Sequence, residues 1–192
     1  MASSCRVAAS SNHLSNNMDA TARDMLNIAN RTGSTAKLYG LTGQQVGALA
    51  ATFLELKTPP EVAATGINAL LLKLKAADKQ NKKFQEGLAG IGLNARTLKQ
   101  SIEQDAQGAL IGFLETVKSS DDVMGTLMDL FGAEYADGMA KLVGGLDSYR
   151  EALALVADQT AYAGSMQQEY EARAATTENQ LTLFANQVTR LG

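Results

Sequence analysis

The sequence predicts an all-α protein: an array or bundle of short helices followed by one long C-terminal helix. Hydrophobic residues make up 45% of the 192 residues, enough to form a core, whereas aromatic residues are only 5% and prolines number two. This composition is typical of helices. Nowhere do β-branched or aromatic residues alternate over a strand-length run, so we predict no strand. Apolar residues instead recur at helical spacing along most of the chain.

The first eighteen residues are predicted to be a poorly ordered N-terminal segment. They begin with a Ser/Ala-rich stretch that contains Cys5, and His13 follows in a polar context. A lone cysteine cannot form an internal disulfide, so we interpret Cys5 as an exposed thiol. His13 is interpreted as a surface histidine. The stretch lacks the continuous apolar run of a secretory signal, which favours synthesis in the cytoplasm.

Residues 19–158 are predicted to form a multi-helical module. The first helix is expected to be capped by Asn17 or Asp19 and to end before Gly33. A second begins at Thr42, because Thr42 and Gln45 have the spacing of a capping box. Pro59-Pro60-Glu61 then opens a third helix, since a proline fits the first turn and an acid complements the positive end of the helix dipole.

Further short helices are predicted up to residue 157. Residues 87–94 have the composition of a helix end and turn, and Asn94 can cap a helix that buries Leu98 and Ile102. We expect helices over 106–118, over 121–131 with Ser120 as the cap, over 134–143, and over 148–157 after a Gly144-Gly145 turn. In the helix over 106–118, the residues expected to face the core are Leu110, Phe113, Leu114 and Val117. Helices this short are marginal alone, so they must pack on one another.

Residues 159–192 are predicted to form one long amphipathic helix. Its apolar stripe advances in steps of three or four residues from Tyr162 to Leu191. Two interpretations remain open: the stripe packs back on the preceding module, or it joins copies of the chain. The candidate self-association residues are Tyr162, Met166, Tyr170, Leu181, Phe184 and Val188.

Charge and hydropathy exclude several classes of partner. Residues 119–192 hold four Lys/Arg against eleven Asp/Glu, which disfavours nucleic-acid binding by this half. A lysine-rich group lies farther upstream and is interpreted as a solvated helix face, with a phosphate or acidic-partner contact as the alternative. Its members are Lys73, Lys75, Lys79, Lys82 and Lys83. No apolar run approaches the roughly 20 residues of a membrane span.

The sequence lacks the motifs of known catalytic and cofactor sites. There is no phosphate-binding Gly-rich loop, no paired cysteine and no two-histidine helix motif. Asp121 and Asp122 are interpreted as helix-start charges, and Glu169 and Glu171 point to different faces because positions i and i+2 do not meet on a helix. We therefore predict no catalytic, cofactor-binding or metal residue and no enzyme activity.

Residues 36–72 are similar to the core region of phage tail tape measure proteins. The similarity continues through Phe84, Ile91-Gly92-Leu93, Leu130-Phe131-Gly132 and Gly144-Gly145, and closes over 174–188, so that it covers about residues 19–190. The resemblance implies a structural virion protein that lies in the tail lumen and sets tail length while the tail assembles in the bacterial host cytoplasm. It implies the tail-tube protein, tail assembly chaperones and other copies of itself, as a trimer or hexamer, as partners.

This resemblance also sets an expectation about extent. An unbroken helix of 192 residues would span only about 290 Å, far short of a phage tail, so we expect a core segment, fragment or truncated form of the ruler. The alternative function is a soluble helical adaptor or a chaperone-like interaction module, because clustered short helices can offer concave surfaces.

Overall fold

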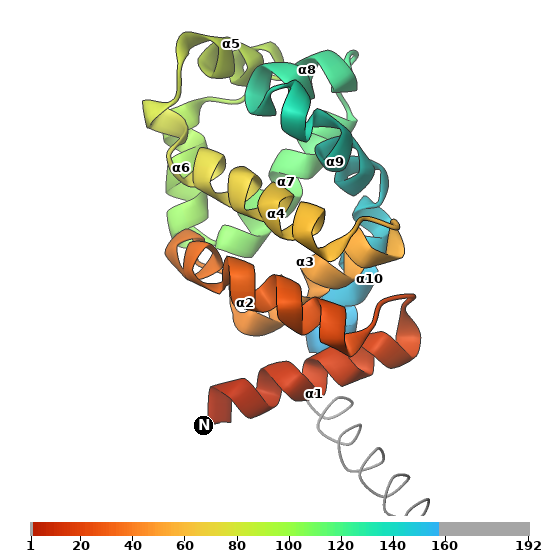
Figure 1. Cartoon of the computed structure of the whole chain (residues 1–192). Helices are drawn as coiled ribbons and strands as arrows, with labels where there is room; N and C mark the ends of the chain where they lie inside the picture. Colours follow the sequence, from red (N-terminus) through yellow and green to blue (C-terminus); the bar gives the residue numbers. More distant parts are fainter. Residues whose placement is uncertain (1, 158–192) are drawn as a thin grey trace, which may run out of the picture.

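A computed structural model describes residues 2–157, and all regular structure in that range is helical (Figure 1). The all-α prediction is confirmed there, whereas the long helix predicted over 159–192 lies outside the described residues. The elements are α1 (Ala2–Asn17), α2 (Ala22–Tyr39), α3 (Gly43–Glu55), α4 (Pro60–Lys75), the 3₁₀ turn η1 (Ala77–Lys79), α5 (Lys82–Gly90), α6 (Ala95–Gln104), α7 (Ala106–Lys118), α8 (Val123–Phe131), α9 (Ala133–Gly144) and α10 (Leu146–Ala157).

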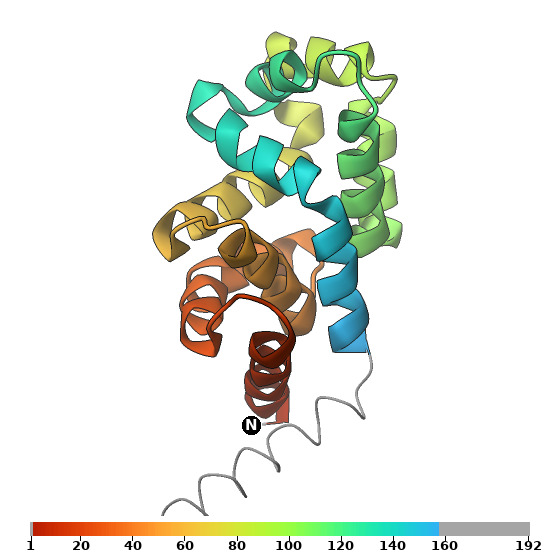
Figure 2. The ribbon, with the colours of Figure 1, turned by 90° about the vertical axis from the view of Figure 1, so that its right-hand side faces the viewer.

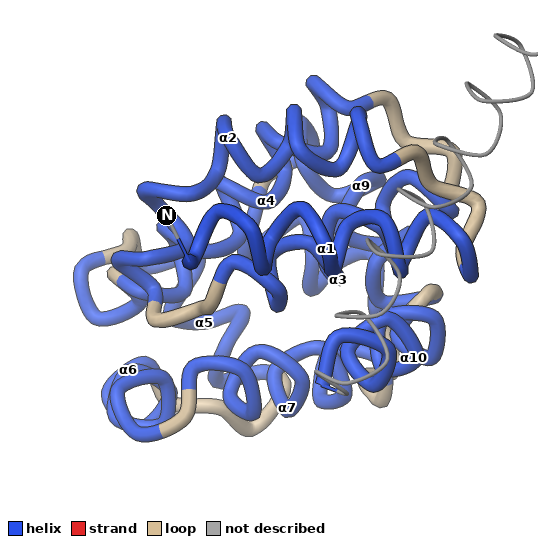
Figure 3. Tube along the Cα trace, turned by 90° about the horizontal axis from the view of Figure 1, so that it is seen from below, coloured by secondary structure: helices blue, strands red, loops and turns tan. Residues whose placement is uncertain are grey.

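Helix α3 forms the centre of the packing. Every residue from Val46 to Phe53 is buried, because α1, α2, α4 and α10 all contact this helix. Its small residues allow that crowding: at Gly47, a Cβ atom would already lie 3.7 Å from Leu14 of α1. Helices α2 and α4 lie on one side of α3, while α6, α7 and α10 lie on the other (Figures 2 and 3).

Helices α2 and α4 pack side by side and run in the same direction, because the chain reverses once into α3 and again into α4 (Figure 1). Asn68 of α4 donates a side-chain hydrogen bond to the carbonyl oxygen of Arg31 on α2, at 3.3 Å. The prediction that the first helix ends before Gly33 is wrong, since α2 continues to Tyr39. Helix α2 continues through Gly33 because the burial of Thr32 and Ala36 against neighbouring helices outweighs the low helix propensity of this glycine.

Local capping signals were predicted with mixed success. The Thr42–Gln45 capping box is confirmed, as are Pro60 at the start of α4 and the Asn94 cap of α6. The predicted caps Asn17 or Asp19 and Ser120 are wrong: Thr21 caps α2 and Asp122 caps α8. Before each of these helices, two or more side chains that could cap it lie within a few residues of one another. The sequence alone did not identify which of them caps the helix.

Two further predictions differ from the structure. The turn expected over 87–94 begins only after Gly90, and Gly87 lies inside α5, where an added Cβ would come within 3.2 Å of Asp129 on α8. Residues 1–18 were expected to be poorly ordered, yet Ala2–Asn17 form α1 and the Leu14 side chain is completely buried. Helix α1 packs on α2, α3 and α10, contacts that helical propensity alone does not indicate.

Candidate interaction surfaces

The predicted self-association residues cannot be placed on the fold. Tyr162, Met166, Tyr170, Leu181, Phe184 and Val188 all lie outside the described residues. The described part ends at Ala157, the last residue of α10, which packs mainly against α3.

The lysine-rich group is divided among several intramolecular contacts. Lys73 donates from Nζ to the carbonyl oxygen of Leu130 at 3.0 Å, and its Nζ lies 5.7 Å from the centroid of the Phe131 ring. Lys82 pairs with Glu86 at 3.2 Å and Lys83 with Asp129 at 3.1 Å. Because Lys82 and Lys83 are matched by acids of the same chain and Lys73 is directed at the end of α8, the group resembles a solvated helix face more than a phosphate site.

An open cleft of about 760 Å³ lies between α5, α7 and α8. Its lining contains five acids, Glu86, Glu115, Asp121, Asp122 and Asp129. Most of them have partners: Glu86 and Asp129 pair with lysines, Glu115 pairs with Arg150, and Asp122 accepts the Gly125 amide at 2.8 Å. Four of the five acids thus serve helix capping or ion pairs within and between helices.

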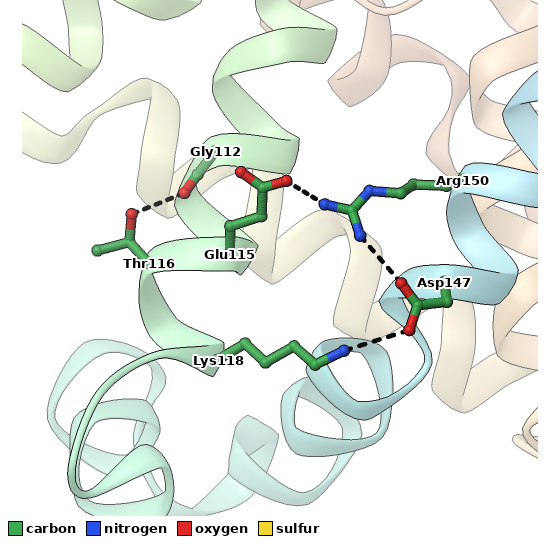
Figure 4. A network of polar contacts seen from close by, with 6 residues as sticks. All are labelled: Gly112, Glu115, Thr116, Lys118, Asp147 and Arg150. Atoms are coloured by element: carbon green, nitrogen blue, oxygen red, sulfur yellow. Dashed lines mark hydrogen bonds and ion pairs between the residues drawn. The ribbon is translucent and has the colours of Figure 1, made fainter.

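Helix α7 is joined to α10 by an ion-pair network (Figure 4). Asp147 accepts from Lys118 at 3.4 Å and from Arg150 at 2.9 Å, and Arg150 also pairs with Glu115. Lys118 and Arg150 hold the pKa of the Asp147 carboxyl below its ordinary value of 3.8. The network is exposed, so it orients the two helices more than it stabilises them.

Within residues 2–157 no group of three or more His, Cys, Asp or Glu side chains could hold a metal ion. A second groove, of about 440 Å³ between α6 and α7, is lined largely by small and polar residues such as Ser101, Gly108 and Gly112. Among the same residues, no helix is long and apolar enough to cross a membrane.

Large apolar side chains are exposed on α2, α4 and α8. They are Leu38 on α2, Val62 and Leu72 on α4, and Met124 and Met128 on α8. Leu38 is 68% exposed, Val62 55% and Leu72 51%. Sequence reasoning did not single out these residues, although Leu38, Val62 and Leu72 lie off the buried stripes of α2 and α4, as their helical spacing indicates.

Helices α2 and α4 also carry an ion pair between their exposed sides. Arg31 Nη2 lies 3.9 Å from Glu61 Oε1, and the two side chains are 50% and 60% exposed. No sequence signal connected these two residues, because the contact depends on the packing of α2 against α4.

Comparisons with known proteins identify relatives. The sequence profile of the "Phage-related minor tail protein" family matches residues 3–144. A "Probable tape measure protein" of Halomonas phage phiHAP-1 is 30% identical over 188 residues. That match covers 97% of this chain and 22% of the relative, so the chain spans about a fifth of that relative's length. No solved structure matches this chain.

Proposed function

Because this chain belongs to the phage minor tail protein family, we propose that it is the core segment of a tail tape measure protein, acting in tail assembly and tail length determination inside the tail tube. The family makes it a structural component of a virion tail. The observation that carries the finer proposal is the match to a probable tape measure protein over 97% of the chain.

The architecture supports a folded module more than a ruler. A ruler must be extended, whereas residues 2–157 reverse direction repeatedly around α3. Helices of nine to eighteen residues, as in α5 and α2, would each span only about 14–27 Å at roughly 1.5 Å per residue. In this proposal length determination belongs to a longer protein, and the present segment provides a compact body within it.

The proposed partners follow from that role. They are the tail-tube protein, tail assembly chaperones and further copies of this chain, as a trimer or hexamer. The site of action would be the tail lumen of the virion, with the host cytoplasm as the place of assembly. Nucleic-acid binding is not part of the proposal, because acids outnumber basic residues in the C-terminal half.

Residues 159–192 are proposed to join copies of the chain through their apolar stripe. The six residues from Tyr162 to Val188 named above would form the contact, since a helix with such a stripe must cover it against another surface. Replacing Leu181 and Phe184 by Asp in the full chain is expected to lower its molar mass in light scattering coupled to size-exclusion chromatography. An unchanged mass would place self-association elsewhere.

We further propose that the chain is not an enzyme. Four of the five acids in the cleft between α5, α7 and α8 are engaged by lysines, by Arg150 or by a helix end, so these four are not arranged as an acid/base pair. The physical role that fits this arrangement is helix packing.

The tail role is tested in the phage or prophage that encodes this chain. An in-frame deletion of residues 19–157 is expected to abolish tails of normal length in negative-stain electron micrographs, and supplying the intact gene in trans should restore them. Mass spectrometry of purified tails separates the alternatives. A tail component must be present in the particle, whereas an adaptor or chaperone-like module would act in assembly and be absent from it.

A further inference from the structure

We draw no further inference here: the strongest candidate, the open cleft between α5, α7 and α8, is a cluster of acids of which four already pair with lysines, with Arg150 or with a helix end, and nothing else in the described residues points to a ligand that it would bind.

Discussion

Lys73 on α4 donates a hydrogen bond to the carbonyl oxygen of Leu130 in the last turn of α8, 3.0 Å away. The same ammonium group lies over the Phe131 ring, 5.7 Å from its centroid, and burial lowers the pKa of the lysine below its ordinary value. A side chain from one helix thus satisfies the C-terminal end of another, which favours a positive charge. This contact joins α4 to α8, one of the helices that line the acidic cleft.

We expect Lys73→Met to lower the free energy of unfolding by about 1–2 kcal/mol, because methionine keeps the aliphatic stem but removes the charged donor and the cation–π contact. Urea denaturation of the full chain measures the change. Lys75→Met, on the same helix, is the control and should stay within about 0.5 kcal/mol of the wild type. Equal effects at the two positions would rule out a specific role for the Leu130 contact.

Lys57→Gly is expected to stabilise the protein by about 0.5–1 kcal/mol. Helices α2, α3 and α5 end in the same way, with a left-handed residue and a hydrogen bond reaching back five residues: Leu41 to Ala36, Thr58 to Phe53, and Leu93 to Leu88. Glycine holds the left-handed position at Gly40 and Gly92, but after α3 the residue is Lys57, with φ 58°.

The reverse change provides the control for that prediction. Gly40→Ala should destabilise by more than about 1 kcal/mol, since it adds a side chain at φ 118° and brings its Cβ within 3.0 Å of Ala106. Both variants are compared with the wild type in urea. A loss of stability in Lys57→Gly would mean that the exposed ion pair between Lys57 and Asp19 outweighs the backbone strain.

Tyr39→Phe is expected to leave stability unchanged or to raise it by up to about 1 kcal/mol, whereas Tyr149→Phe should lower it by about 1 kcal/mol. Both phenols are buried, but they differ in hydrogen bonding: Tyr149 Oη exchanges bonds with Gln107 at 3.0 and 3.3 Å, while Tyr39 Oη has no protein partner. Burial raises the pKa of both hydroxyls above the ordinary value. Thermal unfolding of the two variants compares them directly, and an equal loss in both would contradict this account.

Leu14→Ala should destabilise the protein by about 2–4 kcal/mol, because its side chain is fully buried beside Gly47 and the residue left behind cannot fill the space. Asn16→Ala, at an exposed position of the same helix, is the control. Chemical denaturation distinguishes a docked α1 from an unattached one. If α1 does not pack on α3 in solution, the two variants will unfold at the same urea concentration.

The Asp147 network predicts a loss of stability in acid. The pKa of Asp147 is lowered in the folded protein, so the unfolded chain binds a proton more readily and stability falls as the pH drops from about 4 through the folded-state pKa. Asp147→Asn removes this contribution. The wild type should be the more stable at about pH 6, and the difference should vanish once the carboxylate is protonated. If the stability difference between the wild type and Asp147→Asn is the same at about pH 6 as in acid where the carboxylate is protonated, the pH dependence does not come from Asp147.

Several elements were predictable because their signals are local. The capping box of Thr42 and Gln45, the proline start of α4 and the inward residues of α7 depend on atoms within one or two turns. The C-terminal end of α2 was mispredicted because the low helix propensity of Gly33 was considered without the packing of α2 against its neighbouring helices. Likewise, the role of Gly87 emerges only when α8 approaches α5.

The sequence by itself determined that the described chain is helical, where α3, α4, α6 and α7 begin, and which face of several helices is buried, since these follow from backbone hydrogen bonding and the 3.6-residue period. The tertiary structure alone decided that α1 docks on α3, that Lys73 meets the end of α8, and that Arg31 lies beside Glu61. Those contacts join residues far apart in the chain. Their geometry is set by how whole helices pack against one another, and no local spacing encodes that.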